Sequence, residues 1–124
     1  MNVVDSSGWL EYFAGGPNAE FFAPAIEDVD QLTVPTISIY EVFKRILQQA
    51  SESEALRAVG FMRLGEMVDL TSTTAIHAAK LSAELQIPMA DSIMLACSRE
   101  QGATLWTQDA DLRGLEGVEF TPKG

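Results

Sequence analysis

The sequence predicts an α/β domain of three layers, α/β/α, with a central parallel sheet of four to five strands. Short apolar runs alternate along the chain with segments of helical periodicity, the pattern of parallel strands joined by helices. Right-handed crossovers place such helices on both faces of the sheet. The 124 residues suffice for one core and contain no repeat, linker or low-complexity tract, so residues 1–124 are predicted to form a single domain.

The first half of the chain predicts two strands and four helices. In order they are a strand at 2–4, helices at 8–13 and 18–29, a strand at 32–34, and helices at 38–50 and 51–64. The segment Gly15–Pro17 separates the first two helices, and Pro35 ends the second strand. Apolar residues recur with the helical period in the third helix, at Ile39, Val42, Phe43, Ile46 and Leu47. Ser51 to Glu54 matches a capping box that opens the fourth.

The second half predicts strands at 67–70 and 103–106, a short final strand at 118–120, and helices at 73–85 and 88–100. Ile76 is expected among the apolar positions of the helix at 73–85. Pro88 suits the first turn of the next helix, and Gly102 ends it.

The composition limits which binding partners and which cell compartment are expected. Eight Lys and Arg against 18 Asp and Glu give a net charge of −10, which argues against a broad basic surface for nucleic acid. The acids either serve solubility or gather to hold cations. No apolar run approaches the roughly 18 residues of a membrane span. The N-terminus meets Asp5 without a basic leader, and Cys97 is alone and expected in the core. A cytoplasmic protein without a membrane partner is therefore expected.

Several acids fall where a parallel sheet binds ligands, beyond the carboxyl ends of its strands. Asp5 follows the first strand, and Asp109 and Asp111 follow the strand at 103–106. Glu41 lies in the first turn of the helix after the second strand, and Asp91 in the first turn of the helix before the fourth. Residues far apart in the sequence are thus expected to meet at one edge of the sheet.

Each acid also has a purely structural explanation. Asp5 can cap a helix, and the segment Ser38–Glu41 matches a capping box. Asp91 is favoured by the helix dipole, and Asp109 and Asp111 suit a turn. Together, however, several carboxylates in one pocket repel each other unless a cation offsets their charge. Mg²⁺ and Mn²⁺ prefer such oxygen ligands and can promote phosphodiester hydrolysis by a metal-activated water.

Four stretches in this order carry a resemblance to a known family. They are "VVDSS", "VPTISIYEVFKR", "ADSIMLA" and "TLWTQDADL". Over nearly the whole chain, the sequence resembles the PIN-domain ribonucleases, and most of all the VapC toxins of toxin–antitoxin pairs. The resemblance implies a PIN-like fold and a Mg²⁺- or Mn²⁺-dependent endoribonuclease that hydrolyses RNA. It also implies a homodimer, and a small cognate antitoxin as inhibitor.

The resemblance assigns roles to individual residues. Asp5, Glu41 and Asp91 match the three acids that ligate the metal directly or through water. Asp109 matches the acid of the family's Thr-x-Asp motif. Asp111 corresponds to an additional acid that only part of the family has, and it ranks below the others.

Further residues are expected to support this site. Ser6 and Thr107 match positions whose hydroxyls support the metal centre. Leu112 stands where many relatives have an aromatic residue, a departure expected to affect packing more than chemistry. Lys44 and Arg45 lie one helical turn beyond Glu41, where they can form a local ion pair, remain on a solvated face, or contact an RNA phosphate.

Two other classes of function remain open. One is a non-catalytic binding module with the same fold, and the other is a metal-dependent phosphatase or DNA nuclease that uses the same acids. An EF-hand beginning at Asp109 is rejected, because its twelfth position is Phe120 rather than Glu. No Walker loop or dinucleotide fingerprint is present. His77, the single histidine, is expected to be structural or exposed.

Large apolar side chains are expected mostly in the core, with some covering a partner groove. They are Trp9, Tyr12, Phe13, Phe21, Phe22, Tyr40, Phe43, Phe61, Met62 and Met67.

Overall fold

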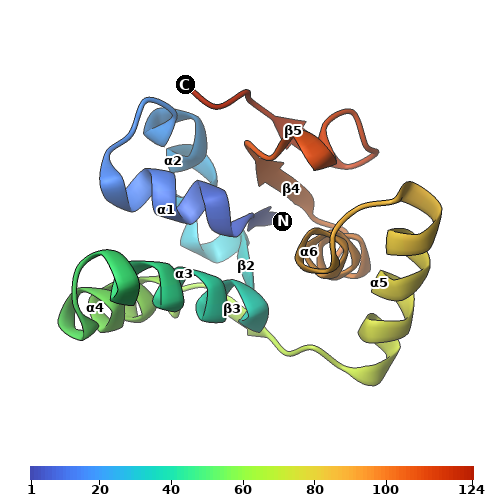
Figure 1. Ribbon diagram of the computed structural model, residues 1–124, viewed down its shortest axis with the longest axis horizontal. Coiled ribbons are helices and arrows are strands. Elements are labelled where there is room, and N and C mark those ends of the chain that lie inside the picture. The colour runs from blue at the N-terminus through green and yellow to red at the C-terminus, as the bar shows by residue number, and fades with distance from the viewer.

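The computed structural model describes residues 1–124 as a five-stranded parallel sheet flanked by helices (Figure 1). The strands are β1 (Asn2–Val4), β2 (Leu32–Pro35), β3 (Glu66–Val68), β4 (Thr104–Thr107) and β5 (Val118–Phe120). The α-helices are α1 (Ser6–Ala14), α2 (Ala19–Glu27), α3 (Thr36–Gln49), α4 (Glu52–Met62), α5 (Ser72–Leu85) and α6 (Met89–Glu100). Two short 3₁₀ helices are η1 (Val29–Gln31) and η2 (Ala110–Leu112). None of the helices combines the length and apolar character that crossing a membrane requires.

The sheet has the order β3-β2-β1-β4-β5, and every neighbouring pair is parallel. β1 is therefore central, and Val3 lies between Thr33 of β2 and Leu105 of β4. All carboxyl ends point to one edge, where the first and fourth strands deliver the residues that follow them. The predicted α/β/α fold with a parallel sheet of four to five strands is confirmed.

The core consists of two apolar clusters, one on each face of the sheet. Val3 and Val4 are successive residues of a strand, so they point to opposite faces and join different clusters. Residues of α1 to α4 build the Val4 cluster, whereas residues of α5, α6 and η2 build the Val3 cluster. Figure 1 shows α1 to α4 on one side of the strands and α5 and α6 on the other. Cys97 is buried in the Val3 cluster, as predicted.

The start of α3 corrects a prediction. The helix begins at Thr36, directly after Pro35, whose extended backbone forms the N-cap. Ser38 is therefore already inside the helix, where its Oγ donates to the carbonyl oxygen of Pro35 at 2.6 Å. The capping box expected between Ser38 and Glu41 is wrong, and the Glu41 carboxylate is free for another contact. The cap predicted at Ser51 is present, since its Oγ accepts from the amide of Glu54 at 3.1 Å.

Three large apolar side chains lie outside the core, two of them from the set expected either in the core or over a partner groove. Ile76 is 61% exposed, because α5 buries only a narrow stripe that includes Ala78 and Leu81. Phe61 is 37% exposed and Tyr40 is 64% exposed. Periodicity predicts which residues share a helix face but not how wide the buried stripe is, which depends on the neighbouring helix.

Candidate metal centre

Asp5 is the residue that joins β1 to α1. Its backbone amide donates to the carbonyl oxygen of Trp106 at 2.9 Å, so the sheet fixes its position. It is the N-cap of α1, and its Oδ1 accepts from the amide of Ser6 at 2.9 Å. Its Oδ2 accepts from Ser7 Oγ at 3.0 Å and from Thr107 Oγ1 at 2.9 Å. Asp5 is thus a helix cap, as its structural explanation predicted, and also a carboxylate held by three donors.

Asp109 lies two residues after the end of β4, the strand that pairs with β1. Its backbone amide donates to Thr107 Oγ1 at 2.9 Å, so this hydroxyl links Asp109 to Asp5. The Oδ1 of Asp109 accepts from the amide of Asp111 at 2.9 Å and caps η2. Leu112, in the same turn, is fully buried in the Val3 cluster and anchors the turn to the core. Leu112 therefore has a packing role in this turn.

Asp91 lies in the first turn of α6, where a carboxylate interacts favourably with the helix dipole. Pro88 is the N-cap residue and lacks an amide hydrogen, which a helix start does not need. Every residue from Asp91 to Ser98 is buried, so α6 is held firmly against the sheet. Its first turn thereby brings Asp91 to the carboxyl edge of the strands.

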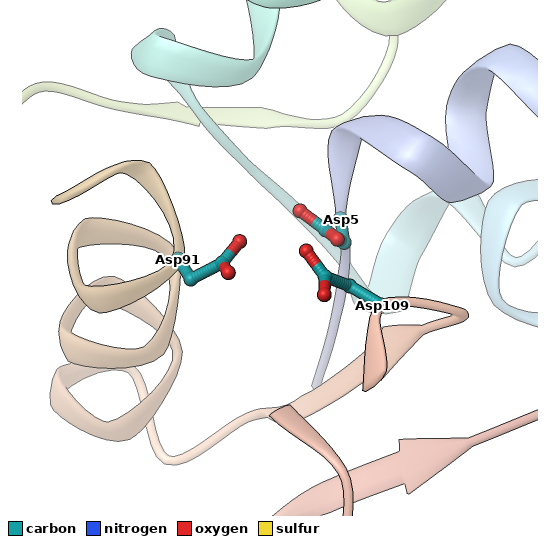
Figure 2. A group of neighbouring side chains, drawn as sticks. All are labelled: Asp5, Asp91 and Asp109. Carbon is teal, nitrogen blue, oxygen red and sulfur yellow. The ribbon is translucent and has the colours of Figure 1, made fainter. Parts of the chain in front are cut away.

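The carboxylates of Asp5, Asp91 and Asp109 converge from three separate elements (Figure 2). One oxygen from each lies within 4.8 Å of the others. Asp5 and Asp91 are buried and Asp109 is half-buried. None of them forms an ion pair, because the one ion pair of the structure joins His77 to Glu100. An all-oxygen donor set whose charge no protein cation offsets fits a hard divalent cation such as Mg²⁺ or Mn²⁺.

Burial and mutual repulsion shift the titration of these acids. The pKa of Asp91 is raised to about 8, first because burial disfavours the charged form and then because Asp109 and Asp5 repel it. The pKa of Asp5 is also raised by burial, although hydrogen bonds from Thr107, Ser7 and Ser6 oppose the shift. The folded protein therefore stabilises protons on this cluster that the unfolded chain releases near pH 4.

This difference predicts a pH dependence of stability in metal-free buffer. Between about pH 4 and about pH 8 the folded state binds more protons than the unfolded state, so the free energy of unfolding falls as pH rises. We expect a decrease of the order of 1–3 kcal/mol between pH 5 and pH 8, measured by urea unfolding in EDTA. Mg²⁺ added at pH 8 is expected to restore stability, because it binds only the folded state. A profile that rises over this range would contradict the burial of uncompensated carboxylates.

Glu41 lies beside the three converging acids rather than among them. Its Oε1 accepts from Ser6 Oγ at 2.6 Å, and it lines the same pocket as Asp5, Asp91 and Asp109. Glu41 therefore lies on α3, which forms one wall of the pocket, and contacts Ser6, the residue after Asp5.

Asp111 is exposed and does not line the pocket. Its contact with the centre is the hydrogen bond from its amide to Asp109, together with a weak repulsion that contributes to the raised pKa of Asp91. Its predicted lower rank agrees with this peripheral position.

The acids open into a pocket of about 400 Å³ at the carboxyl edge of the sheet. Lys44 and Arg45 line it, and neither forms an ion pair with Glu41. Three further polar residues line it that the site prediction did not include: Ser7, Tyr40 and Gln48. Ser7 was detectable as a second hydroxyl after Asp5, and Tyr40 and Gln48 as residues four positions before and after Lys44 on one helix face.

Thr107→Val is expected to loosen the centre without removing an acid. The substitution deletes the hydroxyl that donates to Asp5 and accepts from the amide of Asp109. We expect a loss of about 1–3 kcal/mol in the free energy of unfolding in EDTA, and Mn²⁺ binding weakened about 10- to 100-fold by calorimetry. The matched control is Thr33→Val, since the Thr33 hydroxyl is buried without a partner and its removal is expected to be neutral or stabilising. Equal effects of the two substitutions would contradict this role of Thr107.

The remaining cations and the histidine lie elsewhere. His77 is part-exposed and its Nδ1 lies 2.9 Å from Glu100 Oε2, so it has the structural role expected of it. Arg99 donates to the carbonyl oxygen of Glu116, and Arg113 lies over the ring of Phe120.

The carboxyl edge of the parallel sheet carries three neighbouring carboxylates, and none of them is paired with a cation. A domain with this arrangement belongs to the class that can hold a divalent metal ion at that edge. The chain belongs to the PIN domain family, whose sequence model matches residues 3–118. The family resemblance predicted from the four motifs is thereby confirmed. No curated protein sequence matches the chain at a significant level.

Solved structures share the fold along nearly the whole chain. A toxin–antitoxin complex from Klebsiella pneumoniae matches with a TM-score of 0.79 and 21% identity, covering 96% of this chain and 96% of that one. VapBC2 from Rickettsia felis, bound to a promoter DNA fragment, matches at 0.74 and 11% identity, covering 98% and 97%. VapC20 from Mycobacterium tuberculosis, described as a sarcin-ricin loop cleaving toxin, matches at 0.73 and 15% identity, covering 95% and 98%.

Proposed function

We propose that this protein is a divalent-metal-dependent endoribonuclease that acts as the toxin of a toxin–antitoxin pair. The observation that carries the proposal is the convergence of Asp5, Asp91 and Asp109 within 4.8 Å at the carboxyl edge of the sheet. Membership in the PIN domain family supports it, as do the similar structures described as toxins. The expected site consists of these acids with Glu41, and with Asp111 at lower rank.

The acids of the centre are expected to bind the metal ion. Asp5, Asp91 and Asp109 would hold Mg²⁺ or Mn²⁺, with Glu41 beside them on the wall formed by α3. When bound, such an ion would supply charge neutralisation at a phosphodiester and a water of lowered pKa for its hydrolysis.

Hydroxyl groups and cations near this centre are expected to support it in two ways. Ser6 and Thr107 keep the acids in place through the hydrogen bonds described above. Lys44 and Arg45, on the same pocket wall as Glu41, would attract the phosphates that flank the reacting one.

The proposed partners follow from the same family. A small cognate antitoxin would inhibit the nuclease, since similar structures are toxin–antitoxin complexes, including VapBC from Salmonella typhimurium and VapBC-1 from Haemophilus influenzae. We further propose a homodimer that acts on RNA in the cytoplasm. Size-exclusion chromatography with light scattering would test the dimer separately from the activity.

A substrate panel tests the reaction. Purified protein is incubated with labelled structured RNAs, single- and double-stranded DNA and a phosphate monoester, each with Mg²⁺, Mn²⁺ or EDTA. Cleavage of RNA that requires metal and is absent in Asp91→Asn would support the proposal. Preferential cleavage of DNA or of the monoester would instead establish a DNA nuclease or a phosphatase. No cleavage, with no metal bound by calorimetry, would favour a non-catalytic binding module.

A further inference from the structure

One face of α3 forms a polar wall that leads away from the acids. Tyr40, Lys44 and Gln48 follow each other at intervals of four residues, so they lie along one line of the helix surface. All three line the pocket that also contains Asp5, Asp91 and Asp109. From Tyr40 to Gln48 this line is about 12 Å long, at 1.5 Å per residue.

Tyr40 contributes nothing to the core and lies open beside the metal centre. It is 64% exposed, although the ring of a tyrosine is one of the larger apolar surfaces a protein has to bury. Its hydroxyl takes part in none of the side-chain hydrogen bonds of the structure. The contact of its ring is with Lys44, whose Nζ lies 5.7 Å from the ring centroid. An aromatic ring in contact with a cation at the rim of a polar pocket is therefore available to a ligand.

The charge of the wall indicates an anionic ligand. The chain has a net charge of −10 and only eight Lys and Arg, yet Lys44 and Arg45 both line the acidic pocket. Neither is in an ion pair, so both charged groups are free to contact a ligand. Lys44 touches the exposed ring of Tyr40, and Arg45 is a second unpaired cation in the same pocket. This set matches the two contacts that single-stranded nucleic acid makes with proteins, phosphate to cation and base to ring.

We propose that Tyr40 and Lys44 form a subsite for one unpaired nucleobase and its adjoining phosphate, next to the metal centre. The base stacks on the exposed part of the Tyr40 ring, and Lys44, with Arg45 beside it, contacts the phosphate. A base inside a duplex cannot reach the ring, so the subsite selects a segment whose bases are unstacked. This subsite rests on the proposed nuclease function and adds to it a residue that reads the strand beside the reacting phosphate.

Binding of short single-stranded oligoribonucleotides that contain 2-aminopurine tests this subsite. The variants are Tyr40→Ala and Tyr40→Phe in an Asp91→Asn background, so that a bound strand stays intact. The matched control is Leu47→Ala, a half-exposed position of the same helix outside the pocket. Tyr40→Ala is expected to weaken binding about 5- to 100-fold and to abolish the quenching of 2-aminopurine, while Tyr40→Phe and Leu47→Ala retain both. Circular dichroism and Tm verify that each variant is folded.

A Lys44→Gln variant tests the phosphate contact. The slope of log Kd against log salt concentration is expected to fall by about 0.7, the contribution of one phosphate in a single strand. A duplex of the same sequence is expected not to compete for binding.

Two results would overturn the subsite. One is binding and quenching by Tyr40→Ala equal to those of its background. The other is an altered oligomeric state in Tyr40→Ala with unchanged quenching, which would assign the ring to an interface between copies. If the unmodified protein shows metal-dependent cleavage but binding does not depend on Tyr40, the subsite is wrong and the proposed nuclease function stands. Tyr40-dependent quenching without any cleavage would support the subsite and remove the nuclease.

Discussion

Asp91→Asn is expected to abolish metal-dependent cleavage and yet to stabilise the metal-free protein at pH 8. The amide keeps the shape of the carboxylate but is a poor ligand for a hard cation, so the rate is expected to fall at least about 100-fold. In EDTA the substitution removes a buried charge that Asp109 and Asp5 repel. We expect the free energy of unfolding to rise by about 1–3 kcal/mol at pH 8, measured by urea unfolding, and by much less at pH 5.

The matched control for Asp91→Asn is Asp30→Asn. Asp30 is exposed in η1, directly before β2, and so lies at the amino edge of the sheet, opposite the acids. Neither cleavage nor stability is expected to change. If Asp91→Asn were folded and cut RNA as fast as the parent, Asp91 would not be a metal ligand. If it lost stability at pH 8 in EDTA, its carboxylate would have a structural role instead.

Gly8→Ala is expected to destabilise the fold by about 1–3 kcal/mol, because the first turn of α1 has no room for a methyl group. A Cβ on Gly8 would lie 2.6 Å from the Phe22 ring and 2.8 Å from Val4 Cγ1, both in fully buried side chains. Relief requires α1 to move away from the sheet. Since Gly8 is three residues after Asp5, the same movement would shift Asp5 against Thr107 and weaken Mn²⁺ binding in calorimetry.

Gly60→Ala provides the comparison for Gly8→Ala. Gly60 lies inside α4, and a Cβ added there meets no atom within 4 Å. Alanine favours the helix more than glycine does, so this substitution is expected to stabilise the protein by about 0.5–1 kcal/mol. Thermal unfolding that gave the same sign for both substitutions would contradict the tight packing of α1 on Phe22.

The strand rule predicted the acids at Asp5 and Asp109 from the sequence. Both residues follow segments that were predicted as strands and are strands in the structure. Parallel strands direct the residues that follow them to one edge of the sheet. Asp91 was predicted in the first turn of its helix, and the position of that helix against β1 brings it to the same edge. For these residues local pattern and sheet geometry agree, and the structure places all three together.

Features that depend on packing between distant segments could not be predicted in this way. The local pattern around Glu41 indicated a capping box, whereas its partner is Ser6, 35 residues away. The hydroxyl of Thr107 bridges two acids because β4 lies directly beside β1, a pairing that no local pattern encodes. The exposure of Tyr40 likewise depends on where the wall of the pocket ends rather than on the periodicity of α3.

The central place of β1 has a consequence for the order in which the domain is completed during translation. The ribosome delivers Asp5 first and Asp91 much later, but Thr107, at the end of the strand β4 that borders β1, comes 102 residues after Asp5. A nascent chain that ends before β4 holds two of the three acids and lacks the hydroxyl that positions the first of them. The acidic edge therefore stays incomplete until residue 109 has left the ribosome, and a shorter nascent chain lacks the full set of three carboxylates.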